Sequence, residues 1–521
     1  MTNLTQANDQ ETQQVWRLEY FRQLDQRLDI TISYLANSPR AQVRSHIRSF
    51  LTLLSESHRS PDLTQKAIAL ITKLHPLPLR WGLGHLWEAE LQFALNHINP
   101  LLSEQAAEYM CSLGDVYLFR GQFERAAAQA EMALSESAAS LGQQARAVRI
   151  LFTCYRSSGQ PQKADVLIEQ NRARFFGDRA AEEVPVHASL GWLTYQQCRL
   201  ELLREQGEVD RALSLSEEMI WLDDRTGAAD KVLTADLYTH RSTLLWVRSR
   251  YPEAVSDLKQ AMQLFEQVED TFNSESLKSN LGLVYWTMGE LDLAEETLLS
   301  VMRFFRETGS DQLLTYVIAN LGLVYFARGD LDAALKLTQE HIALSQRINF
   351  IHEYNRGRRN LGTILYYFGE YERSIEETTA SHKYYETRGS RDAYGLDNLW
   401  LALCFNALGE LDRALKMAVE TLSWAKAHQS RVLEQVTLRC MAEFLPQEDR
   451  ETPLQRSLAL ACEMDRKLEE AAVRLKLASV YKDQRSQEAW DAGAAILERI
   501  GAGKWLSGRS MVDPPFIPLL L

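Results

Sequence analysis

The sequence lacks the features of a disulfide-stabilised, secreted or membrane-spanning protein. Only six of its 521 residues are cysteines, and they are scattered with no CxxC pair, which is typical of a reducing compartment. No apolar run reaches the roughly 18 residues that a membrane span needs. Residues 1–14 are polar and contain no signal-peptide pattern. We therefore expect a cytoplasmic protein without membrane contact, beginning with a disordered leader over 1–14.

Clustered positive charge and metal-ligand spacing are also missing. The chain has 57 Lys and Arg against 70 Asp and Glu, a formal net charge of −13, whereas a broad nucleic-acid surface needs clustered cations. The eleven histidines show no HExxH or other ligand spacing. The sequence predicts no nucleic-acid partner, no metal, no cofactor and no catalysis, although a Cys–His nucleophile pair formed in space stays open.

The sequence does contain one motif that occurs four times. Asn280-Leu281-Gly282-Leu283-Val284-Tyr285 recurs at 320–325 and 360–365, and more loosely as Trp400-Leu401-Ala402-Leu403-Cys404-Phe405. A glycine follows each copy at the same offset, and a small residue follows that glycine: Gly289 and Ala294, Gly329 and Ala334, Gly369 and Ser374, Gly409 and Ala414. The period is 40 residues, so this region is a repeat array.

Each part of the motif has a structural role in a helix pair. Leu281, Val284 and Tyr285 form one stripe of an amphipathic helix. Gly282 permits a neighbouring helix to approach closely, and Gly289 is placed to end the helix with a positive φ. Each repeat is thus predicted to be a pair of antiparallel helices.

This pattern resembles the tetratricopeptide repeat, whose usual period is about 34 residues. The longer period is similar to that of the repeat regions of kinesin light chain, spindle-orientation adaptors and bacterial maltose-activator-like regulators. The resemblance implies an all-α fold, a superhelical solenoid of antiparallel helix pairs.

The strength of the pattern divides the chain into regions. We expect a helical N-terminal cap with degenerate repeats at 15–103, irregular repeats at 104–231, regular repeats at 232–430 and degenerate C-terminal repeats at 431–505. A proline-rich apolar tail, 506–521, follows. Because its end, 516–521, is apolar, we expect this tail to dock on the solenoid or on a partner.

The concave face of such an array is the predicted binding surface. Its most regular feature is an aromatic column, Trp246, Trp286, Phe326 and Tyr366, with Tyr316 and Tyr367 beside it. Aromatic side chains serve as anchors for a bound peptide or helix. Ideal repeats also favour an aromatic at this position, so contact with a ligand and packing of the repeat both stay open.

Two polar sets accompany the aromatic column. Asn280, Asn320 and Asn360 form a second column, which in the long-period relatives holds the main chain of a bound peptide; bonding to an adjacent helix is the alternative. Arg356 and Arg359 provide local positive charge for an acidic partner, unless they pair with acids of the chain itself, with Glu353 close by.

The leading functional hypothesis is a bacterial-type, non-catalytic module that holds a protein or peptide segment in its concave groove. The first alternative is a regulator that senses a small molecule or signal peptide. The second is a regulatory subunit of a CHAT-type, caspase-like protease. The sequence leaves the identity of the partner and the oligomeric state open.

Overall fold

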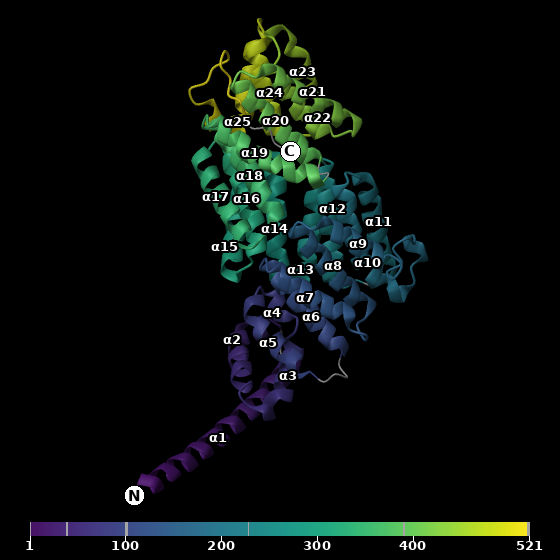
Figure 1. The fold of residues 1–521 in the computed structure, drawn as a ribbon, viewed down its shortest axis with the longest axis vertical. Helices are drawn as coiled ribbons and strands as arrows, with labels where there is room; N and C mark the ends of the chain where they lie inside the picture. The colour runs from purple at the N-terminus through teal and green to yellow at the C-terminus, as the bar shows by residue number, and fades with distance from the viewer. Residues whose placement is uncertain (1, 38–39, 99–102, 228, 389–390, 518–521) are drawn as a thin grey trace.

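The computed structural model of this chain describes residues 2–37, 40–98, 103–227, 229–388 and 391–517. Within these ranges the regular structure is α-helix and short 3-10 helix, with no strand. Successive helices run antiparallel and stack side by side (Figure 1). The prediction of an all-α tetratricopeptide-type solenoid is confirmed.

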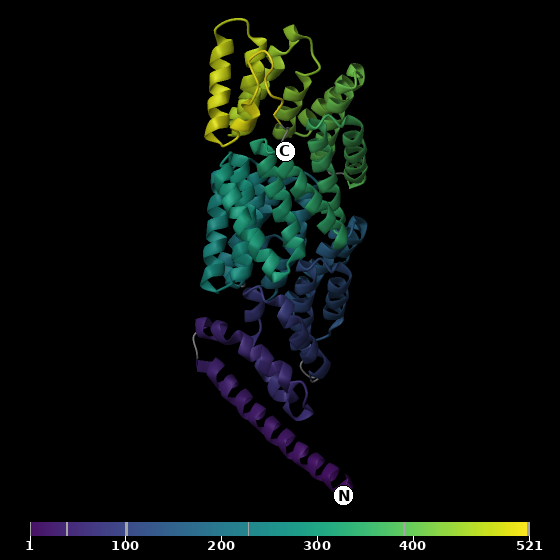
Figure 2. The ribbon, with the colours of Figure 1, turned by 90° about the vertical axis from the view of Figure 1, so that its left-hand side faces the viewer.

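The N-terminal region is a group of helices from which α1 extends away (Figure 2). The helices are α1 (Thr2–Asn37), α2 (Arg40–Ser57), η1 (Pro61–Leu63), α3 (Thr64–Leu74), α4 (Leu77–Arg80) and α5 (Gly84–His97). The disordered leader expected over 1–14 differs from the structure, in which α1 begins at Thr2. No glycine or proline interrupts the chain from Thr2 to Asn37, so nothing local stops the helix.

The irregular repeats follow as α6 (Ser103–Phe119), α7 (Phe123–Ser135), α8 (Leu141–Ser157), α9 (Pro161–Asn171), η3 (Ala181–Glu183), η4 (Val186–Ala188), α10 (Ser189–Glu205) and α11 (Val209–Thr226). The two 3-10 helices lie in the long connection between α9 and α10, where the spacing of the repeat glycines lengthens in the sequence.

The regular repeats are five helix pairs. They are α12 (Lys231–Val247) with α13 (Tyr251–Gln267), α14 (Thr271–Met288) with α15 (Leu291–Thr308), α16 (Asp311–Arg328) with α17 (Leu331–Arg347), α18 (Ile351–Tyr367) with α19 (Tyr371–Arg388), and α20 (Arg391–Ala407) with α21 (Leu411–Ala427). The first helices of these pairs begin at equal intervals along the chain.

The chain closes with shorter helices and the tail. The helices are α22 (Arg431–Met441), η5 (Gln447–Asp449), α23 (Glu451–Glu463), α24 (Lys467–Val480), α25 (Arg485–Arg499) and η6 (Gly503–Leu506). Residues 507–517 of the tail contain turns and bends but no helix. Residues 518–521 lie outside the described ranges.

Helix α15 shows how the repeat sequence produces this packing. Leu291, Ala294, Leu298, Val301 and Phe305 share one stripe and are at most 2% exposed. A Cβ added to Gly282 of α14 would lie 2.7 Å from the side chain of Leu298, so the close approach predicted for this glycine is present. Small residues therefore set the distance between the two helices of a pair.

The helix ends also follow the repeat pattern. Gly289 ends α14 with φ +83°, as predicted. In the preceding pair Ser249 occupies the glycine position and has φ +59°. The chain thus keeps the same left-handed turn even where the sequence replaces glycine.

The stack coils so that its N-terminal part meets its middle. Phe119 of α6 lies 5.1 Å from Phe272 of α14, and Phe123 of α7 lies 5.4 Å from Phe350, measured between ring centroids. One hydrophobic core includes residues of α1, α14–α16, α24 and the tail. Contacts between successive turns of the superhelix therefore hold the coil closed.

No helix in the described part of the chain combines the length and apolar character needed to cross a bilayer.

Candidate functional site

A pocket of about 280 Å³ lies among the first helices of the five regular pairs. It is lined by Trp246, Leu283, Trp286, Gly322, Leu323, Phe326, Thr338, Arg356, Arg359, Asn360, Thr363, Ile364, Leu396 and Trp400. Apart from Thr338 of α17, these residues belong to α12, α14, α16, α18 and α20. Equivalent positions of successive repeats therefore face one shared space.

The predicted aromatic column supplies much of this lining. The Nε1 of Trp246 donates to Oγ1 of Thr287 at 2.8 Å, and the Nε1 of Trp286 donates to the carbonyl oxygen of Leu323 at 3.2 Å. Each tryptophan thus donates a hydrogen bond to the first helix of the next repeat. Because Trp286 is only 7% exposed, it both packs the array and forms a wall of the pocket.

The other predicted aromatic residues lie outside the pocket lining. Tyr366 and Tyr367 are 6.1 and 6.4 Å from Phe516 of the tail, between ring centroids. Tyr316 packs edge-on against Phe350 at 5.5 Å. The fourth position of the column is therefore covered by the chain's own tail.

Trp400 is a lining residue that the sequence analysis did not select. It occupies the position of the asparagine column in the fourth copy of the repeat. Its side chain is 1% exposed and contacts Tyr366 at 5.7 Å. An aromatic replacing asparagine at this position was the signal in the sequence that could have identified it.

The asparagine column falls into three different environments. Asn280 is exposed, Asn320 is buried, and Asn360 lines the pocket. The Oδ1 of Asn320 accepts a hydrogen bond of 2.7 Å from Nη2 of Arg356. Asn320 therefore holds a side chain of the next repeat.

The two predicted arginines line the pocket but have carboxylate partners. Arg356 donates to Glu353 at 3.1 Å, the pairing that the alternative interpretation predicted. Arg359 donates to Asp397 at 2.5 Å and lies over the ring of Tyr385. Both guanidinium groups are therefore fixed in place by the chain itself.

Electrostatics explains why Glu353 can be fully buried. Burial acts to raise the pKa of this carboxyl, but Arg356, together with His341 and His352, outweighs burial and holds the pKa well below its usual range. Burial lowers the pKa of His341, whose Nε2 donates to Oε2 of Glu353 at 3.1 Å. The carboxylate stays ionised and anchors α17 to α18.

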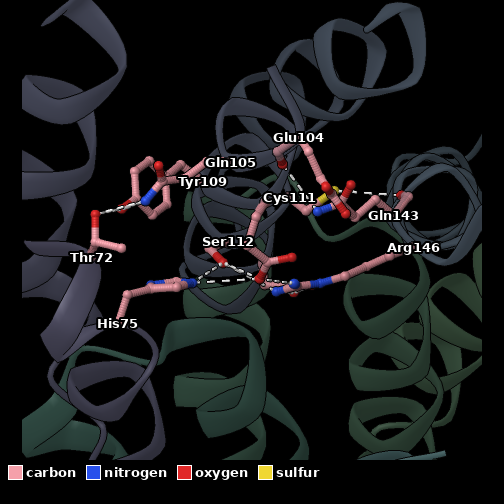
Figure 3. A network of polar contacts seen from close by, with 11 residues as sticks. Thr72, His75, Glu104, Gln105, Tyr109, Cys111, Ser112, Gln143 and Arg146 are labelled. Atoms are coloured by element: carbon pink, nitrogen blue, oxygen red, sulfur yellow. Dashed lines mark hydrogen bonds and ion pairs between the residues drawn. The ribbon is translucent and has the colours of Figure 1, made fainter. Parts of the chain in front are cut away.

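A polar network that includes His75, Ser112 and Arg146 lies near the N-terminal end (Figure 3). There His75, which follows α3, faces Ser112 of α6. The same atom, Nε2 of His75, is 3.3 Å from Oγ of Ser112 and 3.4 Å from Oε1 of Glu108. A catalytic triad uses the two ring nitrogens separately. This network does not have that arrangement; it joins His75 to α6 and, through Arg146, to α8 (Leu141–Ser157), and we call it the N-terminal clamp.

Three buried cysteines have thiols that resist ionisation. Burial raises the pKa of Cys111 and Cys154 to about 12 and that of Cys404 to about 11, which disfavours the reactive thiolate. Across the described ranges, no group of three or more His, Cys, Asp or Glu residues is arranged to hold a metal ion.

Acid is expected to weaken the N-terminal clamp through Glu108. Burial raises the pKa of this carboxyl, but Arg146, bonded at 2.7 Å, and His75 outweigh it and lower the pKa from 4.5 to about 2. The unfolded chain therefore binds the proton more readily, so this stabilisation is complete above about pH 4.5 and is lost as pH falls towards 2. Arg146→Met should reduce the change in unfolding free energy between pH 5 and pH 3, measured by urea denaturation.

The control for this measurement is Arg373→Met, which removes the exposed partner of Glu370. This variant should keep the wild-type pH dependence, because exposed pairs contribute little. An R146M protein whose stability changes with pH as much as the wild type does would contradict the assignment.

Comparisons with known proteins agree with this architecture. Tetratricopeptide-repeat family profiles match residues 273–347 and residues 107–132. A search of curated proteins gave no match. The repeats and their stacking define a tetratricopeptide-repeat protein.

Several solved structures have a similar fold. One is a Rap protein complexed with competence and sporulation factor, with a TM-score of 0.53 and 12% identity, covering 70% of this chain and 98% of that one. A second is the Rap conjugation gene regulator of plasmid pLS20 with the Phr* peptide (TM-score 0.47, 12% identity, 64% and 94% covered). A third is the apo quorum sensor NprR from B. thuringiensis (0.42, 15%, 69% and 99%). At 12% identity the likeness to the first of these structures shows the fold alone.

Proposed function

We propose that this protein is a non-catalytic binding module that holds an extended segment of a protein or peptide partner in the pocket between α12 and α20. The observation that carries the proposal is the pocket itself, in which Trp246, Trp286, Phe326 and Trp400 from four helices converge on one space. Aromatic side chains in a desolvated pocket are the usual anchors of a protein interface.

The polar groups of the lining support a peptide rather than a highly charged ligand. Asn360 lines the pocket and can donate to and accept from a peptide main chain. Arg356 and Arg359 are already paired with Glu353 and Asp397. This pairing weakens their electrostatic attraction for an anionic ligand. A mainly apolar segment with main-chain hydrogen bonds is the ligand that this lining fits.

A second candidate is a regulator that senses a small effector or signal peptide. The supporting observation is the size of the pocket, about 280 Å³, which is close to the lower end of small-ligand sites. The Rap protein of similar fold was solved with a bound factor. A sensor of this kind should bind its effector without a second protein and change its overall dimensions, which calorimetry and small-angle scattering would detect.

Filling the pocket with a larger side chain is expected to weaken partner binding strongly. Leu323 is half-buried in the lining, so Leu323→Trp places a larger ring in the space that the ligand needs. We expect capture of the partner from a lysate of source cells to fall at least about tenfold, equivalent to about 1.4 kcal/mol. Quantitative mass spectrometry of proteins retained by each immobilised variant measures this.

The matched control is Leu293→Trp, the same substitution at a side chain of α15 that is 46% exposed. The L293W protein should retain the partner as the wild type does. If L323W is folded and retains every protein that the wild type retains, the pocket is not the binding site.

A further inference from the structure

The chain from η6 through the tail contacts the helices at two points. At the first, Nε1 of Trp505 in η6 donates to the carbonyl oxygen of Ala327 at 2.9 Å, and Lys504 pairs with Asp330 at 2.7 Å. At the second, Phe516 and Ile517 enter the stack, and Ile517 is fully buried. Between these points residues 507–510, 512 and 513 are exposed, and Val512 is 91% exposed. The tail is thus an exposed loop that ends in a buried anchor.

The second anchor lies in a subsite made by aromatic residues. The ring of Phe516 lies 6.1 Å from Tyr366, 6.4 Å from Tyr367 and 6.3 Å from Trp400, between centroids. Trp400 also lines the pocket, and Phe326 of the pocket contacts Trp505 at 6.4 Å. The tail therefore borders the pocket and covers the fourth position of its aromatic column.

A buried arginine binds the main chain of the tail. Arg439 is 3% exposed, and its Nη1 donates to the carbonyl oxygen of Ile517 at 2.7 Å. Its guanidinium lies 5.5 Å from the centre of the Phe516 ring, and its Nε pairs with Glu469 at 3.0 Å. A main-chain carbonyl is present in any peptide, so this contact can be made by a different extended segment.

The tail is held mainly by side chains. Within the described ranges, no hydrogen bond between two main-chain groups joins residues 514–517 to the helices, and Pro514 and Pro515 have no N–H to donate. An aromatic anchor and one carbonyl contact on a proline-containing extended segment are how peptides dock in aromatic grooves. Its release therefore requires no helix to unfold.

We propose that the tail is an intramolecular ligand, and that Tyr366, Tyr367, Trp400 and Arg439 form the subsite of the groove that selects an extended apolar segment with an aromatic anchor. This inference rests on the proposed function, because the partner segment displaces Phe516 and then extends into the pocket. The tail leaves the subsite open in only a fraction of the molecules. The apparent affinity for any such segment is the intrinsic affinity multiplied by that fraction. A tethered competitor acts at about millimolar effective concentration, so the reduction equals the ratio of that concentration to the dissociation constant of the untethered tail segment.

The test uses the full chain and a fluorescent synthetic peptide of residues 510–521. Phe516→Ala weakens the tethered anchor, so the labelled peptide should bind the F516A protein at least about tenfold more tightly than it binds the wild type, measured by fluorescence anisotropy. A peptide carrying the same substitution should not bind. Val512→Ala, in the exposed part of the tail, is the matched control and should bind the peptide as weakly as the wild type does.

The proposal is overturned if folded F516A protein binds the peptide no better than the wild type. If F516A does not fold, as judged by circular dichroism, Phe516→Leu takes its place, since it keeps most of the apolar volume while removing the ring contacts. The proposal is also overturned if the peptide binds F516A but does not reduce capture of the partner by that variant; in that case the pocket remains the binding site and the subsite binds only the chain's own tail. Loss of the proposed function itself would be seen separately, as unchanged partner capture by L323W.

Discussion

Replacing Asp397 by alanine is expected to lower the free energy of unfolding by about 3–5 kcal/mol, because it leaves the guanidinium of Arg359 without its partner in a buried site. The side chain of Asp397 is fully buried, and that of Arg359 is 13% exposed. Asp397 also accepts a hydrogen bond of 3.0 Å from Ser381, so three helices meet at this carboxylate. Urea unfolding followed by tryptophan fluorescence gives the change.

Two variants separate lost charge pairing from lost volume. Removing both charges, in Arg359→Met with Asp397→Ala, should recover part of the loss, because no unpaired charge then stays buried. Glu463→Ala breaks another pair between helices, Arg431 with Glu463, in which both side chains are about half exposed. This control should cost less than about 1 kcal/mol. Equal costs for D397A and E463A would show that burial of the pair has no energetic consequence.

The second large effect is expected at Gly121, where two turns of the superhelix meet. Gly121 has φ +71°, and a Cβ at this position would lie 2.6 Å from Cβ of Ile348. Gly121→Ala therefore combines backbone strain of about 1–2 kcal/mol with overpacking of about 1–3 kcal/mol. We expect a total loss of about 2–5 kcal/mol and a more open particle in small-angle scattering.

Gly369 provides a close control. Its φ is +76°, but a Cβ there would meet nothing within 4 Å. Gly369→Ala should therefore show the backbone strain alone and leave the scattering curve unchanged. If G121A and G369A cost the same and scatter alike, the contact between the turns does not hold the coil closed.

Local features of the fold could be predicted because the repeat specifies them residue by residue. The stripe of Leu281, Val284 and Tyr285 identified a helix, Gly289 identified its end, and Gly282 identified a close helix crossing. The leader over 1–14 was interpreted from polar composition, yet helix α1 begins at Thr2, since polar residues without glycine or proline also form helix.

The pocket was partly predictable for the same reason. Trp246, Trp286 and Phe326 occupy one position of successive repeats, so they face the same space. Tyr366 belongs to the same column but lies against Phe516, a residue far along the chain. Asn320 bonds Arg356, because the neighbouring helix brings that guanidinium within reach.

The sequence alone determined the helix pairs, their glycine-ended turns and the column of aromatic side chains, because these depend on the pattern within one repeat and on its recurrence every 40 residues. Only the tertiary structure decided that Phe119 and Phe123 meet the middle of the array, that Asp397 neutralises Arg359, and that the tail enters the subsite beside Trp400. The physical reason is that the small rotation between neighbouring pairs accumulates over the stack. The resulting curvature brings Phe119 and Phe123 to the middle of the array, whereas Arg359 and Asp397 meet through the packing of two neighbouring pairs.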